Sequence, residues 1–254
     1  MVKYNINYSV KILSYNIYYK SMLGIDKNFS PQSEAQNNVK KIIKSGDYDI
    51  IGLQEAQCIE KIFDKITLSK YNYIEGKSGK DVVITFLKKK YKIINYLNTE
   101  FCEGRPIQIL VTNINNDNII IVNLHAPHHH QDFGNYKGTI NKSNSKYSLE
   151  LIKIINNKIS LFVKSLIKNT DIDRIILLGD FNEIFNRIDT FKFNLNINNK
   201  VFEMKTDRNK KLSCCYNNFD KTSDYIFDSV TEPKLMISST IHPASDHYPV
   251  ETTI

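Results

Sequence analysis

The chain has 254 residues, of which 41% are hydrophobic and 11% aromatic, and its formal net charge is +7. This length and composition suit one large folded unit, and we expect a single domain over residues 1–254. No apolar run is long enough to cross a membrane, and the polar N-terminal segment argues against a secretory signal, so we expect an intracellular protein without a membrane span.

The positive charge suits a polyanionic partner such as nucleic acid, because it attracts phosphates over a long range. The sequence is rich in Lys, Asn and Ile throughout, so the lysine excess also fits a general compositional bias. The four cysteines, Cys58, Cys102, Cys214 and Cys215, lack the paired spacing of a metal site, and in an intracellular protein we expect reduced thiols.

The N-terminal part reads as strand, helix, strand, helix. A strand over residues 10–17 brings Asn16 to its end, and a helix follows that ends at Gly46. A second buried strand over residues 49–53 ends on Glu55, a carboxylate that burial would penalise unless a positive charge such as a metal ion compensates it. One helical face, over residues 59–66, comes next.

The middle of the chain changes to short β-type runs. Their spacing, at 81–87, 91–97, 107–113 and 119–124, predicts antiparallel hairpins. Arg105 lies between the middle two runs, where it is either a loop arginine or a phosphate clamp. The last run leads into His125, and we read the three histidines at 128–130 as part of a solvated loop.

A long amphipathic helix over residues 147–166 leads into a strand of four consecutive apolar residues at 175–178. Gly179 ends this strand in our interpretation, and Asp180 and Asn182 follow. Taken alone, this Gly-Asp-Phe-Asn segment is typical of a turn. A short apolar run that starts at Asp224 and a terminal strand complete the chain.

Polar residues recur where buried strands end or begin, and this shared position is what an active site at a sheet edge requires. These residues are Asn16, Glu55, His125, Asp180, Asn182, Asp224, Asp246 and His247. Carboxylates and amides without cysteine ligands suit a hard divalent cation such as Mg²⁺. Histidines with a separate aspartate suit proton transfer near neutral pH. Together they indicate metal-assisted attack of water on a phosphate ester.

Four motifs occur in a characteristic order, and the chain thereby resembles the endonuclease/exonuclease/phosphatase superfamily, which has the deoxyribonuclease I-like fold. The motifs are Asp-Ile-Ile-Gly-Leu-Gln-Glu at 49–55, Gly-Asp-Phe-Asn at 179–182, Asp-Tyr-Ile-Phe at 224–227 and Ser-Asp-His-Tyr-Pro-Val at 245–250. The resemblance implies an α/β protein, a four-layer α/β sandwich in which two mixed β-sheets pack face to face with helices on the outside. It places the active site at one edge of the sheets.

The resemblance also implies a metal site. Glu55 is the expected principal ligand, with Asn16 and Asp246 nearby, and the implied ion is Mg²⁺, for which Mn²⁺ can substitute.

The remaining site residues are expected to handle protons and phosphate. Asp224 would orient His247, on which the reaction depends, and either Asp180 or His247 would take the proton. Asn182 and Arg105 would bind phosphate. His125, at a position where base-excision endonucleases usually have asparagine, is closer to deoxyribonuclease I and the sphingomyelinases, and we count it as catalytic.

The leading hypothesis is therefore an intracellular Mg²⁺-dependent phosphodiesterase, an endonuclease that acts on DNA as a monomer without an obligate protein partner. A second hypothesis keeps this chemistry and changes the substrate to inositol phosphates, phospholipid head groups or other nucleotide esters. A third is an inactive scaffold that binds nucleic acid, which the complete set of site residues disfavours.

Overall fold

The computed structural model describes residues 9–26, 31–57, 59–138, 144–166, 170–182, 192–207, 213–214, 223–237 and 245–254. Two β-sheets form its centre. Sheet A contains, in order across the sheet, β12 (Met236–Ile237), β13 (Val250–Thr253), β1 (Lys11–Asn16), β2 (Ile50–Gln54), β4 (Asp81–Lys88) and β3 (Tyr71–Ser78). Sheet B contains β5 (Ile93–Glu100), β6 (Pro106–Ile114), β7 (Asp117–His125), β8 (Arg174–Asp180), β11 (Asp224–Asp228), β10 (Lys200–Lys205) and β9 (Lys192–Ile197).

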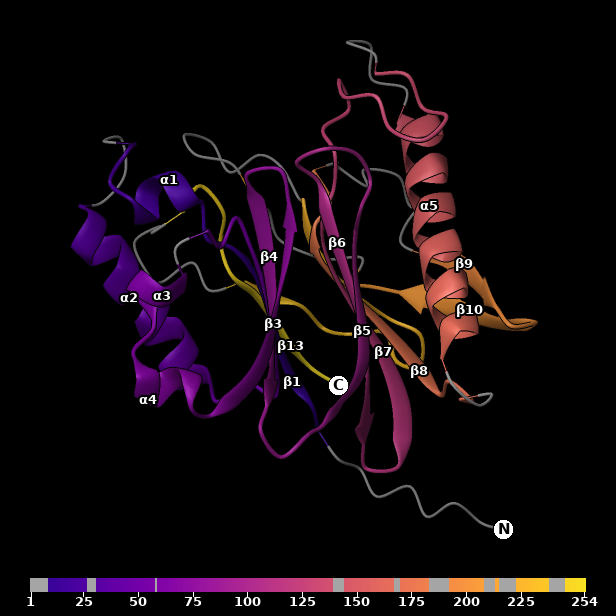
Figure 1. The fold of residues 1–254 in the computed structure, drawn as a ribbon, viewed down its shortest axis with the longest axis horizontal. Coiled ribbons are helices and arrows are strands. Elements are labelled where there is room, and N and C mark those ends of the chain that lie inside the picture. The colour runs from indigo at the N-terminus through magenta and orange to yellow at the C-terminus, as the bar shows by residue number, and fades with distance from the viewer. Residues whose placement is uncertain are drawn as a thin grey trace.

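The helices lie on the two outer sides of this pair of sheets (Figure 1). On one side are α1 (Tyr19–Met22), α2 (Gln32–Gly46), α3 (Ile59–Ile62) and α4 (Lys65–Leu68), and on the other is α5 (Asn144–Ser165). The order of layers is therefore helices, sheet A, sheet B, helix. The expected four-layer sandwich of two mixed sheets is confirmed, because each sheet combines parallel and antiparallel pairs.

Three clusters of buried apolar side chains hold the layers together. The first joins α5 to the outer face of sheet B, and the second joins α2 and α3 to the outer face of sheet A. The third lies between the sheets, where residues such as Ile12, Ile121 and Leu178 meet. Strands covered on both faces must be apolar along their whole length, which explains the continuous hydrophobic run of β8.

A polar contact crosses the apolar interior just below the end of β2. Gln54 Nε2 donates a hydrogen bond of 2.7 Å to Asn123 Oδ1, and the Asn123 amide donates to the carbonyl oxygens of Leu53 and Ile84 at 3.3 and 3.0 Å. Gln54 and Asn123 are fully buried. Buried hydrogen bonds of this kind are strongly directional, so this link sets how the two sheets sit relative to one another at the edge that carries the polar residues.

The structure corrects several sequence-based expectations. The helical face at 59–66 is two short helices, because the Asp64 carboxylate caps a new helix by accepting a hydrogen bond of 2.7 Å from Thr67 N. Gly179 lies within β8, which runs on to Asp180. Strands β3, β9 and β10 were not predicted. Cys58 and Cys215 lie outside the described residues, as do residues 139–143 of the loop after β7.

Candidate active site

Strand direction brings the polar residues to one edge of the sandwich. β1 and β2 are parallel, as are β7 and β8, so these four strands end together at Asn16, Gln54, His125 and Asp180. β4, β6, β11 and β13 run antiparallel to a neighbour among them and begin at the same edge. Each site residue thus lies at the end or start of a strand, or within four residues of it.

The register in sheet B places three of these residues side by side. His125 lies opposite Asp180 in the parallel pair of β7 and β8, and Asp224 lies opposite Asp180 in the antiparallel pair of β8 and β11. Gly179 permits this approach, since a Cβ at that position would lie 2.0 Å from the Leu124 carbonyl oxygen.

Asp180 is the centre of the site. Its Oδ2 accepts a hydrogen bond of 3.0 Å from Asn16 Nδ2 and lies 3.6 Å from Nε2 of both His125 and His247. Its Oδ1 accepts a hydrogen bond of 2.8 Å from the Asn182 backbone N–H. Burial alone would raise the pKa of Asp180, but His247, His125 and these hydrogen bonds lower it below its usual value. The buried carboxyl group is therefore held in its ionised form.

His247 is held by Asp224. Its Nδ1 lies 2.9 Å from Asp224 Oδ2, which also accepts a hydrogen bond of 2.8 Å from Ser213 Oγ. Burial alone would lower the pKa of His247, but Asp224, Asp180 and Asp246 raise it well above its usual value. Nδ1 thus carries a proton toward Asp224, and Nε2 faces Asp180.

His125 is held in the same way by a carboxylate that was not predicted. Its Nδ1 lies 2.6 Å from Oδ2 of Asp81, the first residue of β4. Its Nε2 accepts a hydrogen bond of 2.8 Å from Arg105 Nη1. Because a guanidinium can only donate, this contact places the ring proton on Nδ1, toward Asp81. The side chains of both histidines are less than a tenth exposed.

Glu55 and Asp246 are carboxylates with weak partners. Among the described residues, Glu55 accepts one long hydrogen bond, 3.4 Å from Asn16 Nδ2, and Asp246 lies 3.4 Å from Ser245 Oγ and 3.8 Å from His247 Nε2. Burial is the main cause that raises the pKa of each carboxyl group, and nearby carboxylates raise it further. Their ionised forms therefore need a positive charge, and a cation that binds oxygen ligands would supply it.

Asn16 stands between these groups. Its Nδ2 faces Asp180 and Glu55, while its Oδ1 accepts a hydrogen bond of 3.0 Å from Tyr18 N. A second cation-compatible set lies next to it: one ligand atom each from Asp180, Asp224 and His247 lies within 4.8 Å of the others. In this second set, the hydrogen bond between Asp224 and His247 already compensates the charge of Asp224.

Two site residues have a left-handed backbone conformation. Glu55 and Asn182 both have a φ of 52°, in the left-handed region. This conformation is common for asparagine and costly for glutamate, so the surrounding structure holds Glu55 in place. Asn182 Nδ2 donates a hydrogen bond of 2.7 Å to Ala126 O, which ties the loop after β8 to the loop after β7.

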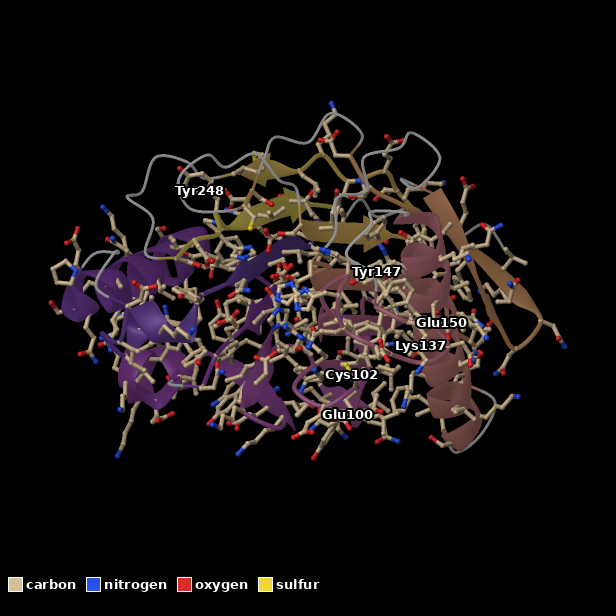
Figure 2. All side chains as sticks on the ribbon, turned by 90° about the horizontal axis from the view of Figure 1, so that it is seen from above. Glu100, Cys102, Lys137, Tyr147, Glu150 and Tyr248 are labelled. Atoms are coloured by element: carbon tan, nitrogen blue, oxygen red, sulfur yellow. The ribbon has the colours of Figure 1, made fainter. Side chains whose placement is uncertain are left out.

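Tyr147 of α5 joins these two loops through its hydroxyl group. Its hydroxyl lies 2.5 Å from Pro127 O and 3.1 Å from Phe181 O, and its ring is buried. Figure 2 shows Tyr147 beside α5, with Tyr248 on the other side of the molecule, toward the indigo elements. Sequence reasoning counted Tyr147 only as an apolar helix position, because its hydroxyl contacts depend on loops far away in the sequence.

Two other expectations need correction. His128 is not fully solvated: it is half-buried, and burial together with the nearby Arg105 guanidinium lowers its pKa to about 4. Of the cysteines, Cys102 is a free thiol, as expected, but Cys214 is disulfide-bonded. The spacing of the cysteines contained no signal for this bond.

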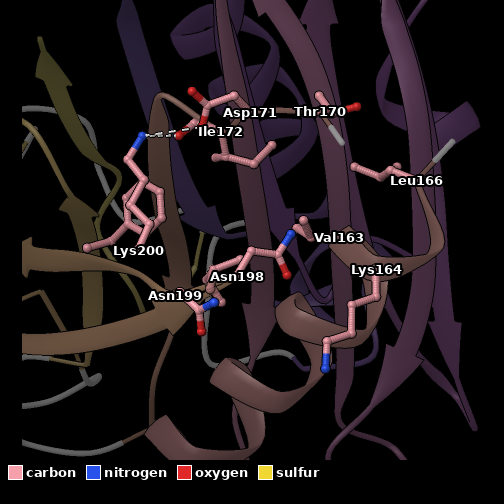
Figure 3. A pocket seen from close by; sticks show the side chains of 11 residues that line it. Val163, Lys164, Leu166, Thr170, Asp171, Ile172, Asn198, Asn199 and Lys200 are labelled. Carbon is pink, nitrogen blue, oxygen red and sulfur yellow. Dashed lines mark hydrogen bonds and ion pairs between the residues drawn. The ribbon is translucent and has the colours of Figure 1, made fainter. Parts of the chain in front are cut away.

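A separate cavity of 780 Å³ lies at the opposite end of β8 (Figure 3). It is lined by the C-terminal part of α5, by Asp171 and Ile172 before β8, and by the β9–β10 hairpin. The Lys200 ammonium donates a hydrogen bond of 2.5 Å to Ile172 O and lies 3.7 Å from Asp171. Lys200 is thus already paired, and no histidine lines the cavity among the described residues.

No family model matches the chain. It is 29% identical, over 96% of its length, to an uncharacterized protein, L684, of Acanthamoeba polyphaga mimivirus, and it spans about half the length of this curated relative. Among solved structures it is similar to ANGEL2, a 2′,3′-cyclic phosphatase, with a TM-score of 0.70, 17% identity and coverage of 98% of this chain and 95% of the other.

Two further structures are similar. An endonuclease/exonuclease/phosphatase family protein from Bacteroides thetaiotaomicron has a TM-score of 0.64 and 17% identity, with 97% of this chain and 94% of the other covered. TDP2 from Caenorhabditis elegans, in truncated form, has a TM-score of 0.63 and 16% identity, with 97% of each chain covered. The chain has the endonuclease/exonuclease/phosphatase fold. At these identities the similarity establishes the fold alone.

The endonuclease/exonuclease/phosphatase fold explains why residues so distant in sequence meet. All nine predicted site residues lie at the edge described above, including Arg105, which directly precedes β6. The residues that sequence reasoning missed at this edge are Asp81, Tyr147 and Gln131, the last of which accepts a hydrogen bond of 2.9 Å from Arg105 Nε. No described helix is both long and apolar enough to cross a membrane.

Proposed function

We propose that this protein is a Mg²⁺-dependent phosphodiesterase, a hydrolase that cleaves phosphate ester bonds and acts on DNA as an endonuclease. The observation that carries this proposal is the arrangement around Asp180. An ionised, buried carboxylate lies between two histidines, and each histidine is held by a carboxylate of its own. This arrangement can take a proton from water and give one to a leaving oxygen at the same edge.

The directions of the pKa shifts of Asp180 and His247 support one division of the proton-transfer roles. Asp180, with its lowered pKa, fits the acceptor that orients and deprotonates the attacking water. His247, with its raised pKa, fits the donor that protonates the leaving oxygen, and Asp224 stabilises its imidazolium form. The reaction is then a single in-line displacement without a covalent enzyme intermediate.

Phosphate binding falls to Arg105, His125 and Asn182. Arg105 now donates to His125 Nε2, and a phosphate oxygen can take the place of that acceptor. Burial alone would lower the pKa of His125, but Asp81 and other nearby carboxylates raise it above its usual value, so the ring can become a second donor once Arg105 has turned to the phosphate. Hydrogen bonds from its backbone N–H to Asp180 and from its side-chain amide to Ala126 O hold Asn182 at the same edge of the sheets.

Glu55 and Asp246 would hold the cation through their carboxylate oxygens, and Asn16 lies beside them with its Nδ2 toward Glu55 and its Oδ1 bonded to Tyr18 N. These carboxylate oxygens fit Mg²⁺ better than zinc, and burial, the main cause that raises the pKa values of the two carboxyl groups, favours a cation beside them. When bound, Mg²⁺ polarises a phosphoryl oxygen and neutralises developing negative charge. The strained backbone of Glu55 is consistent with a residue kept for binding rather than for stability.

The choice of DNA rests on the net charge of +7 and on the resemblance of the motif at 245–250 to deoxyribonuclease I. Purified protein with Mg²⁺ should nick supercoiled plasmid, whereas Asp180→Asn and His247→Ala should lose nicking. Glu55→Gln should raise the Mg²⁺ concentration required for half-maximal activity. The panel should include abasic DNA, RNA, inositol phosphates, sphingomyelin and a 2′,3′-cyclic phosphate end, since ANGEL2 is a 2′,3′-cyclic phosphatase.

Intact plasmid after prolonged incubation, or nicking that survives both substitutions, would refute the endonuclease proposal. Release of phosphate from an inositol phosphate, with DNA left intact, would keep the chemistry and change the substrate.

A further inference from the structure

The loop after β7 carries two stacked imidazole rings at the rim of the site. The ring centroids of His128 and His130 are 5.3 Å apart, and their planes differ by 11°. The His129 ring meets His130 edge-on, at 5.6 Å and 86°. His128 is half-buried and His130 is exposed, so the stack runs from the protein surface outward. Exposure of the outermost ring argues against a role in the core.

Gln131 links the His128–His130 stack to Arg105, the side chain that we assign to phosphate binding. Gln131 Oε1 accepts hydrogen bonds from Arg105 Nε at 2.9 Å and from His128 N at 2.8 Å. Gln131 N in turn donates to His128 O at 2.9 Å, which closes the loop. Arg105 contacts His125 through Nη1, at 2.8 Å from His125 Nε2. One glutamine thus fixes the position of the stacked rings relative to the phosphate-binding side chains.

Adjacent histidines could also suggest a metal site, but the geometry disfavours it here. Parallel rings direct their nitrogens along the ring planes rather than toward a common point between them. The set of three potential ligands found among the described residues is Asp180, Asp224 and His247, which does not include this loop. The exposed ring of His130 is therefore better suited to an aromatic contact than to metal binding.

We propose that His128 and His130 form a stacking subsite for an unpaired nucleobase of the substrate, beside the phosphate held by Arg105 and His125. This inference rests on the proposed phosphodiesterase function and names its substrate class: a nucleotide ester whose base is free to leave a duplex. Every nucleobase presents a π-face, so stacking binds it without reading its sequence. Inositol phosphates and lipid head groups have no aromatic ring and gain nothing from this subsite.

Charge and order at the stack support this assignment. Burial and the Arg105 guanidinium lower the pKa of His128 to about 4, so this ring is uncharged at neutral pH and keeps a flat, neutral face under His130. Tyr136 donates a hydrogen bond of 2.8 Å from its hydroxyl to His129 O, which fixes the middle of the histidine segment. A platform that is already ordered loses little entropy when a base binds.

Fluorescence offers a direct test, because the chain contains no tryptophan. His130→Trp places a single reporter within the stack, and Tyr73→Trp places a matched reporter on β3, at a side chain that is 46% exposed. We expect deoxyadenosine monophosphate to quench the His130→Trp variant but not the Tyr73→Trp variant, in chelator as well as in Mg²⁺. Ribose 5-phosphate, which has the phosphate but lacks the base, should leave both signals unchanged.

Kinetics provide the second measurement. His130→Ala should raise KM for a single-stranded dinucleotide by about fivefold or more, with kcat little changed, and His130→Phe should restore it. An oligonucleotide that is abasic at the stacked position should be cleaved equally by wild type and His130→Ala. An unchanged KM for the dinucleotide, or equal quenching by ribose 5-phosphate, would overturn the subsite.

The two proposals fail separately in this design. If wild type cleaves no phosphodiester, the proposed function is wrong, but quenching of the His130→Trp variant in chelator still reports whether the base stacks. If wild type cleaves the dinucleotide and His130→Ala matches it in KM, the stacking subsite is wrong while the phosphodiesterase stands.

Discussion

The buried ion pair of Arg174 and Asp228 joins β8 to β11, two strands of the site. We predict how much free energy of unfolding is lost when this pair is broken. Arg174 begins β8 and Asp228 ends β11, at the opposite end of these strands from Asp180 and Asp224. Two hydrogen bonds of 2.7 Å join the guanidinium to the carboxylate, and the side chains are 8% and 0% exposed. Removing one partner of a buried pair leaves an uncompensated charge.

We expect Arg174→Met to lower the free energy of unfolding by about 3 kcal/mol, the lower end of the range of about 3–5 kcal/mol for broken buried pairs. The lower end applies because Asp228 Oδ2 keeps hydrogen bonds of 2.7 and 2.6 Å from the backbone N–H and hydroxyl of Thr231. For a chain of this length, such a loss corresponds to a fall in Tm of roughly 6–12 °C. Urea unfolding followed by circular dichroism measures it.

The matched control is Lys44→Met. Lys44 forms an ion pair with Asp64 at a similar distance, 3.0 Å, but the two side chains are 51% and 47% exposed. Its loss should cost much less than the loss of Arg174, because water already compensates both charges. The double variant Arg174→Met with Asp228→Leu should recover part of the stability lost by Arg174→Met. If Arg174→Met and Lys44→Met cost the same, burial does not govern these pairs and the reasoning fails.

Two other predictions follow from the supporting shell of the site. Tyr147→Phe leaves the carbonyl oxygens of Pro127 and Phe181 without their hydroxyl partner. We therefore expect the free energy of unfolding to fall by about 1–3 kcal/mol, and kcat to fall by more than KM changes. An unchanged kcat would contradict a positioning role for Tyr147. His128 should titrate near pH 4 by NMR. Because the folded state then binds this proton more weakly than the unfolded state, the contribution of His128 to stability is complete above its unfolded pKa and falls as the pH drops from about 6.5 toward 4. His128→Phe should flatten that part of the curve of stability against pH, and a parallel curve would contradict the assignment.

Much of the candidate site could be predicted because buried strands leave a local signal. The apolar run before Asp180 and the run before Glu55 identify strands without any knowledge of their neighbours, and the polar residue after each run marks its end. The order of the four motifs then identified the fold. These features depend on adjacent residues, so they are visible in the chain itself.

Other elements could not be predicted because their cause lies far away in the sequence. Asp81 pairs with His125, 44 residues later, and at its own position it looks like the first residue of a hairpin strand. β3 contains Glu75, Gly76 and Lys77, which are weak strand formers, and it exists because it pairs with β4 along its whole length.

The β9–β10 hairpin did leave a local signal that was overlooked. Its turn residues, Asn198 and Asn199, both have positive φ, as the Asn-rich turns of tight hairpins require.

The sequence alone determined which residue types stand at the strand ends, namely carboxylates, amides and histidines, and the motifs in which they stand. Only the tertiary structure decided which of them lie together. Parallel pairing of β7 with β8 and antiparallel pairing of β8 with β11 bring His125 and Asp224 to either side of Asp180. Register between strands is set by hydrogen bonds across the sheet, and no local pattern along one strand contains that information.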